Sequence, residues 1–177
     1  DIVIFAVKPQ FMGEVLEQLD GGLLQPEALA LSIVAGVTIA RLSRGLKHDA
    51  IVRVMPNTPA QVRMGMSVWT ATPTTTERQR GQARTILEAL GEELYVNHEH
   101  YLDMATALSG TGPAYIFLVM EALIDAGVHM GFSRRVAEQL VIQTMRGSVE
   151  FARQSHLHPA VLRNMVTSPG GTSAEAI

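Results

Sequence analysis

The sequence predicts an α/β domain with a mainly parallel sheet, followed by a domain made only of helices. Strand-like and helix-like segments alternate through the first half of the chain, and the strand signals stop after about His98. Strands separated by helices favour right-handed βαβ units. Hydrophobic residues make up 47 % of the chain and charged residues 18 %, which is typical of globular proteins. We place the domain boundary near Asn97, between residues 1–97 and residues 98–177.

The first half contains short apolar runs typical of strands and longer segments with helical periodicity. Strands are expected at residues 2–7, 30–34, 50–55, 66–70 and 93–96, and helices at residues 11–19, 39–46 and 77–90. The first strand is almost entirely apolar, which predicts a buried parallel strand. Thr74 and Glu77 have the spacing of a capping box at the start of the third helix, and Gly91 is expected to end that helix.

The second half contains only helical segments. They are expected at residues 99–108, 113–130, 134–154 and 159–166, with Ser133 as an N-cap and Pro159 in a first turn. Apolar residues recur at helical spacing in two stripes, which we interpret as core or subunit-interface surface. The stripes are Ile116, Val119, Met120 and Leu123, and Val136, Leu140, Val141 and Met145.

Charge and composition argue against several classes of function. The formal net charge is -3 with no basic block, so nucleic acid is not expected as a partner. The chain has no cysteine, which excludes disulfides and thiolate chemistry and fits a cytoplasmic protein. The most apolar stretch, residues 114–124, contains Glu121 and is too short for a membrane helix, so no membrane partner is expected. His98, Glu99 and His100 lack further ligands at a recognisable spacing, so no metal site is expected.

Two motifs follow predicted strands, where ligands bind in open α/β sheets. In AVKP (residues 6–9), the proline fixes the turn and exposes the backbone before it. In RVMPNTP (residues 53–59), two prolines stiffen a loop, which lowers the ordering entropy of binding. Taken alone, an ordinary turn and a structural loop are the simpler explanations of these two motifs.

Two further motifs are rich in glycine and hydroxyl residues. SGTGPAY (residues 109–115) permits close backbone approach and leads into a long helix at Pro113. In residues 168–173, Gly170 and Gly171 permit an anion-binding nest, and Thr172 and Glu175 have capping-box spacing at a helix start. A helix connection and a well-capped helix without a ligand explain these motifs equally well when each is taken alone.

The order of the four motifs resembles the pyrroline-5-carboxylate reductase family, over nearly the whole chain. The resemblance implies a partial Rossmann-like NAD(P)-binding domain and an all-α dimerisation domain of the 6-phosphogluconate-dehydrogenase C-terminal type. It also implies a cytoplasmic, intertwined homodimer or higher homo-oligomer. The implied reaction is the NADPH- or NADH-dependent reduction of 1-pyrroline-5-carboxylate, an imino acid, to L-proline in the last step of proline biosynthesis.

The resemblance also implies roles for individual residues. Positions expected to contact the cofactor are Ala6, Val7, Lys8, Pro9, Ala35, Asn57, Ser109 and Gly110. Positions expected to bind the substrate are Glu99, Ser168, Gly170, Gly171, Thr172 and Ser173. The Ser173 hydroxyl is the expected catalytic group, as a hydrogen-bond partner of the ring nitrogen. Glu99 is expected either to orient the loop or to favour the iminium charge.

The chain departs from the family pattern in two respects. The family usually has Thr at the position of Ser173, and the serine keeps the hydroxyl but loses a methyl group. The Gly-rich dinucleotide fingerprint expected before Ile2 is absent, and the family continues beyond Ile177. We therefore expect a fragment truncated at both ends, which is not a competent enzyme by itself.

Two other interpretations remain open from the sequence. A reductase of the same architecture acting on a β-hydroxy acid would typically carry a catalytic Lys on the interdomain helix, and residues 113–130 contain none. The second is a catalytically incompetent helical oligomerisation module of the same fold. Retention of Glu99 and of the two glycine-rich motifs argues against it.

Overall fold

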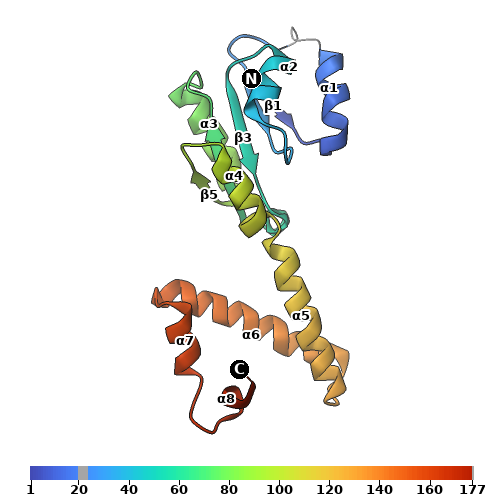
Figure 1. The fold of residues 1–177 in the computed structure, drawn as a ribbon, viewed down its shortest axis with the longest axis vertical. Helices are drawn as coiled ribbons and strands as arrows, with labels where there is room; N and C mark the ends of the chain where they lie inside the picture. Colours follow the sequence, from blue (N-terminus) through green and yellow to red (C-terminus); the bar gives the residue numbers. More distant parts are fainter. Residues whose placement is uncertain (20–23, 177) are drawn as a thin grey trace. The chain divides into compact units, whose positions relative to one another are not determined.

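The computed structural model describes residues 1–19 and 24–176. The chain divides into two compact units, residues 1–115 and residues 116–177 (Figure 1). The first unit holds a sheet flanked by helices, and the second is entirely helical within its described residues. The mainly parallel α/β domain followed by helices, predicted from the sequence, is therefore confirmed. The domain boundary near Asn97 stays a prediction.

The sheet of the first unit has five strands in the order β1-β2-β3-β4-β5. The strands are β1 (Ile2–Phe5), β2 (Leu29–Ser32), β3 (Ile51–Met55), β4 (Gly65–Ala71) and β5 (Gly91–Tyr95). Neighbouring strands are parallel except β3 and β4, which are antiparallel. Residues 56–64, which hold only the short 3-10 helix η2 (Thr58–Val62), are too few for the crossover that a parallel pair needs.

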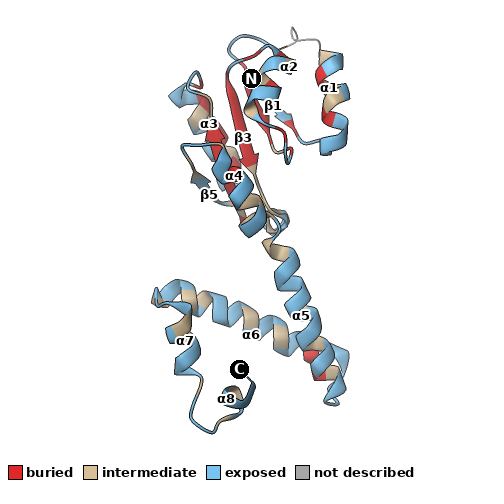
Figure 2. Ribbon diagram, in the orientation of Figure 1, coloured by how far each residue is buried: buried red, intermediate tan, exposed pale blue. Residues whose placement is uncertain are grey.

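Helices cover both faces of this sheet. They are η1 (Pro9–Phe11), α1 (Met12–Leu19), α2 (Ile39–Leu46), α3 (Glu77–Glu88) and α4 (His100–Ala105). Alternate residues of each strand face opposite cores: Ala30 and Ile51 join the core that α1 and α2 cover, whereas Leu31 and Val52 join the core that α3 covers. Burial in this unit concentrates in β2, β3 and β4 (Figure 2).

The first strand differs from its expectation. The sequence predicted a buried strand, but β1 lies at the edge of the sheet and pairs with β2 alone. Only Phe5 of this strand is buried, and Ile4 is 49 % exposed. The apolar run of β1 therefore leaves an exposed apolar edge in this chain.

Both signals expected at the ends of α3 are wrong by a few residues. The capping box is formed by Thr76 and Gln79, not by Thr74 and Glu77. The Thr74 hydroxyl instead donates to the backbone oxygen of Asp49. The helix ends at Glu88, and Gly91 begins β5 with a φ of +142° instead of ending the helix.

The expected helix at residues 99–108 is present but changes its winding. After α4 it continues as a π-helix, η3 (Thr106–Gly110), in which the Thr111 amide donates to the Thr106 carbonyl at 2.8 Å. Single π turns inside helices occur frequently at functional sites. This turn contains Ser109 and Gly110, two of the residues expected to contact the cofactor.

The second unit consists of α6 (Arg134–Ser155), α7 (Pro159–Met165), α8 (Thr172–Ala176) and most of α5 (Gly112–His129). The Ser133 hydroxyl caps α6 and Pro159 begins α7, as predicted. Gly127 allows α5 and α6 to approach closely, because a Cβ there would lie 3.0 Å from the Ala137 Cβ. The cap predicted at Thr172 is wrong by one residue, since Thr172 is already the first residue of α8.

Large apolar residues of α5 and α6 are exposed in this single chain. Figure 2 colours most of both helices as exposed. Ile116, Val119 and Leu123 of the first predicted stripe are about half exposed, at 51 %, 49 % and 49 %. They therefore do not form a core within the described residues. The continuous helical stretch His100–His129 is also long and apolar enough to cross a membrane, with a mean hydropathy of 1.4 in its best window. A count of uninterrupted apolar residues does not find this stretch, because an average over 18 residues tolerates one or two charged side chains such as Glu121.

Candidate cofactor and substrate site

The predicted cofactor residues gather at one edge of the sheet in the first unit. β1, β2 and β3 are parallel, so their carboxyl ends meet at the same edge. Residues 6–9 follow β1, Ala35 follows β2 and Asn57 follows β3. Residues 6–9 and Ala35 are exposed, with short, apolar or rigid side chains except Lys8. Exposed backbone with little side-chain bulk at this edge fits a dinucleotide, which such sheets bind here.

Asn57 joins two parts of this edge through its carboxamide. Its Oδ1 accepts a hydrogen bond from the Met66 amide at 2.8 Å, and its Nδ2 donates to the Ser109 carbonyl at 3.1 Å. The loop after β3 is thereby tied to the start of β4 and to the π turn. The structure thus brings together Asn57, Ser109 and Gly110, which are far apart in the sequence.

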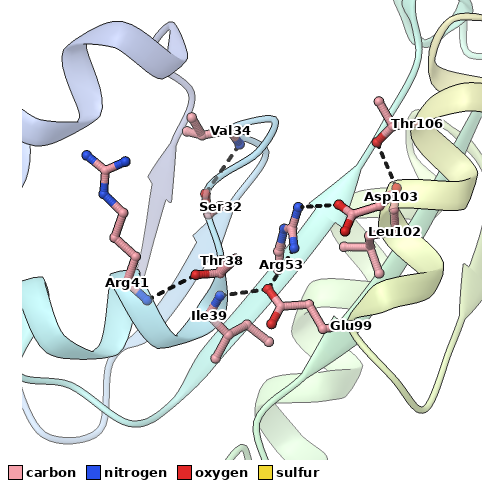
Figure 3. A network of polar contacts seen from close by, with 10 residues as sticks. All are labelled: Ser32, Val34, Thr38, Ile39, Arg41, Arg53, Glu99, Leu102, Asp103 and Thr106. Atoms are coloured by element: carbon pink, nitrogen blue, oxygen red, sulfur yellow. Dashed lines mark hydrogen bonds and ion pairs between the residues drawn. The ribbon is translucent and has the colours of Figure 1, made fainter.

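Glu99 belongs to a polar network beneath the same edge (Figure 3). Its Oε1 accepts from Arg53 Nη1 at 2.7 Å and from the Ile39 amide at 2.7 Å. Arg53 Nη2 also donates to Asp103 Oδ1 at 3.3 Å. The Arg53 side chain is 4 % exposed and that of Glu99 is 29 % exposed. The carboxylate therefore holds the first turn of α2, where free amides and the helix dipole favour a negative charge.

The sequence reading missed Arg53 and Asp103 as parts of this network. One signal was available: Arg53 lies inside a strand whose other residues are apolar, and a buried arginine requires acidic partners. Glu99 and Asp103 are four residues apart, which places them on one face of a helix. Together these patterns would have predicted the pairing, although not the bond to Ile39.

The loop at residues 168–173 lies in the second unit and turns tightly. The Ser168 carbonyl accepts from the Gly171 amide at 3.0 Å, and the Gly171 carbonyl accepts from the Ala174 and Glu175 amides. Gly170 has a φ of +69°, a conformation that glycine adopts without steric cost. Ser168 and Thr172 are exposed and Ser173 is half-buried. Within the described residues, the Ser173 hydroxyl has no hydrogen-bond partner.

The described part of the first unit has one hollow away from the predicted site residues and another beside Glu99. One of about 820 Å³ opens at the amino edge of the sheet, beside Lys47, His48 and Arg78, away from the predicted cofactor residues. Another of about 530 Å³ is lined by Thr70, Thr72 and Glu99 among others. No group of three or more histidine, aspartate or glutamate side chains among the described residues could hold a metal ion.

Known proteins resemble this chain over its full length. It is 41 % identical to a pyrroline-5-carboxylate reductase from Synechocystis sp. and 44 % identical to one from Pseudomonas aeruginosa, and it spans 65 % of the length of each. Over its full length the chain is similar to members of the pyrroline-5-carboxylate reductase family. The resemblance inferred from the four motifs is therefore confirmed. Residues 99–177 match the family model for pyrroline-5-carboxylate reductase dimerisation.

Solved structures of the family have the same fold. The pyrroline carboxylate reductase of Plasmodium falciparum with NADP bound is 37 % identical, with a TM-score of 0.92 over 99 % of this chain and 66 % of that one. The enzyme from Coxiella burnetii is 39 % identical, with a TM-score of 0.87 over 99 % of this chain and 65 % of that one. The Rossmann-like fold followed by a helical dimerisation domain is thus shown for this chain.

Proposed function

We propose that the protein reduces 1-pyrroline-5-carboxylate to L-proline with NADPH or NADH. The observation that carries the proposal is the identity of 41 % to 44 % to pyrroline-5-carboxylate reductases along the entire chain. Because the chain spans 65 % of the length of those relatives, the activity is a property proposed for the protein at their full length.

The loop at residues 168–173 is the proposed substrate site. The positive φ of Gly170 and the tight turn at Gly171 support a nest of backbone amides, which suits the carboxylate of an imino acid. The unengaged Ser173 hydroxyl is the proposed partner of the ring nitrogen. A hydrogen bond there favours the protonated iminium, whose carbon is the better electrophile. The proline nitrogen takes its final proton from solvent.

The carboxyl edge of the sheet is the proposed cofactor side. Ala6, Val7, Lys8 and Pro9 would line the nicotinamide ribose, with Ala35 and Asn57 beside them. When bound, the cofactor supplies the hydride that reduces the C=N bond. The residues of this chain would position the cofactor and the substrate relative to one another. In well-oriented systems, such alignment of two reactants lowers the activation free energy by roughly 7–11 kcal/mol.

A homodimer is the proposed assembly. The half-exposed apolar residues of α5 and α6 lie within the range that matches the dimerisation family. A second copy covering these faces would remove their apolar surface from water. A cytoplasmic location and the absence of membrane and nucleic-acid partners stay predictions from the composition.

An assay of proline formation tests the function. The protein, completed to the relatives' full length, is incubated with pyrroline-5-carboxylate and NADPH. The expected result is NADPH oxidation with an equal amount of L-proline formed. If the completed protein folds and dimerises but forms no proline, the alternative of an inactive oligomerisation module replaces this proposal.

A further inference from the structure

The Arg53–Glu99 pair does more than fill a buried position. Arg53 lies in the middle of β3, and its neighbours along the strand, Val52 and Val54, are buried in the core beneath α3. Glu99 lies directly before α4, which packs against β3 and β4. The pair therefore crosses from the centre of the sheet to a helix that begins more than forty residues later.

The same carboxylate oxygen also reaches a third element. Glu99 Oε1 accepts from the Ile39 amide, the first residue of α2 (Figure 3). Arg53 thus holds Glu99, and Glu99 holds the point where the β2–α2 loop enters its helix. A carboxylate at this position could accept from the Ile39 amide without Arg53. The buried Arg53 guanidinium, however, fixes where the Glu99 carboxylate lies.

The loop that is held in this way carries Ala35. Its start is fixed by the Ser32 hydroxyl, which accepts from the Val34 amide at 3.3 Å. Its end is fixed by the Thr38 cap and by the Glu99 contact at Ile39. Between these two points Val34 and Val37 are buried, and the Val37 amide donates to the Val34 carbonyl at 3.4 Å. Ala35 and Gly36 form the exposed tip of the loop, at the carboxyl edge proposed for the cofactor.

We infer that Arg53 is a positioning residue for the cofactor, which acts through Glu99 and the Ile39 amide on the loop at residues 33–38. The inference rests on the proposed function, because that function places a dinucleotide at this edge. It also assigns Glu99 to the cofactor side, in contrast to the substrate role that the family resemblance implies. Arg53 itself, with its side chain 4 % exposed, does not touch the cofactor.

The experiment compares Arg53→Met, Glu99→Gln, Glu99→Met and the double variant Arg53→Met/Glu99→Met in the completed protein. Dissociation constants for NADPH come from fluorescence titration, and KM and kcat come from proline formation. Hydrogen exchange of the peptide covering residues 33–39 reports the protection of the loop amides, including that of Ile39. Leu102→Val is the control, because Leu102 lies on α4, is fully buried and belongs to the apolar packing.

The expected result is a selective loss of cofactor binding. Arg53→Met raises the dissociation constant and KM for NADPH about five- to tenfold and speeds exchange at Ile39, while kcat at saturating NADPH and KM for the imine change less than twofold. Glu99→Gln keeps an acceptor oxygen and changes NADPH affinity less. The double variant recovers thermal stability relative to Glu99→Met alone but keeps the weak NADPH binding.

Three results overturn the inference. The first is an NADPH affinity of Arg53→Met equal to that of the unsubstituted protein, including the case in which neither binds NADPH. The second is that Leu102→Val loses as much NADPH affinity as Arg53→Met when the two variants lose the same melting temperature. The loss of affinity would then follow from general destabilisation of the domain. The third is a rise in KM for the imine alone in Glu99→Gln, which returns Glu99 to the substrate. Absence of proline formation with intact NADPH binding contradicts the proposed function instead, and the titration and exchange data still decide the inference.

Discussion

Gly91 approaches the backbone of Gly65 so closely that a Cβ on Gly91 would lie 2.2 Å from the Gly65 carbonyl oxygen. The two residues are paired at the start of β5 and β4, and Gly91 has a φ of +142°. A side chain is therefore excluded at Gly91 both by space and by backbone conformation.

Gly91→Ala is expected to lower the free energy of unfolding by about 3 kcal/mol or more, because β4 and β5 must separate. Gly81 on α3 is the matched control, since a Cβ there meets nothing within 4 Å. Gly81→Ala is expected to raise stability by about 0.5–1 kcal/mol through helix propensity. Urea unfolding measures both, and equal effects of the two substitutions would contradict the close approach.

Ser67 and Ser32 give a second matched pair. Both are 1 % exposed, but the Ser32 hydroxyl accepts from Val34 whereas the Ser67 hydroxyl has no hydrogen-bond partner among the described residues. Ser67→Ala is expected to leave stability unchanged or raise it by about 1 kcal/mol, because an unsatisfied buried hydroxyl is removed. Ser32→Ala is expected to lower stability by about 1 kcal/mol. Thermal unfolding of the two variants decides the order.

Asn57 is expected to tolerate neither alanine nor aspartate. Asn57→Ala removes the bonds to Met66 and Ser109 and should lower stability by about 1–3 kcal/mol. Asn57→Asp keeps the acceptor for the Met66 amide but places a carboxylate oxygen against the Ser109 carbonyl. The aspartate variant should therefore be at least as unstable as the alanine variant. A clearly more stable aspartate variant in urea would show that the bond to Ser109 is not formed.

Substitutions of the two partners of the buried ion pair are expected to lower the free energy of unfolding by different amounts. Among the described residues, Glu99→Met leaves the buried Arg53 guanidinium with Asp103, a 72 % exposed partner at 3.3 Å, and should lower the free energy of unfolding by about 3 kcal/mol. Arg53→Met leaves Glu99, which is 29 % exposed and can be hydrated, and should cost about 1–2 kcal/mol. Denaturant unfolding of the two variants under the same conditions measures the difference. The reverse order would mean that Asp103 alone can neutralise Arg53.

Periodicity and end signals predicted most of the elements, and the deviations have physical causes. The bounds of α2, residues 39–46, follow from its apolar spacing and agree with the structure. The alternation of strands and helices did not predict the antiparallel β3–β4 pair. The length of residues 56–64 does predict it, because this connection is too short for the crossover between two parallel strands. Three consecutive threonines, residues 74–76, can each serve as an N-cap, so the sequence does not decide where α3 begins. The structure selects Thr76.

The candidate site was only partly visible in the sequence. Strand ends and glycine-rich motifs singled out residues 6–9, Asn57 and the loop at residues 168–173 as candidates, and their roles stay predictions. The bonds around Asn57 and Glu99 were not visible in the sequence, because the contact of Glu99 with Arg53 and Ile39 depends on which helix packs over which strand. The π turn at Ser109 and Gly110 was also missed, since helical periodicity does not distinguish a wider turn from an ordinary one.

Ser173 gives the most direct test of the account. In the completed protein, Ser173→Ala is expected to lower kcat for proline formation at least about tenfold, because the hydrogen bond to the ring nitrogen is lost. Ser173→Thr keeps the hydroxyl and should retain turnover, and NADPH affinity should be unchanged in both variants. The decisive measurement is therefore the ratio of kcat between the alanine and threonine variants. A ratio of one-tenth or less agrees with the account, and equal turnover of both variants with the unsubstituted protein contradicts it.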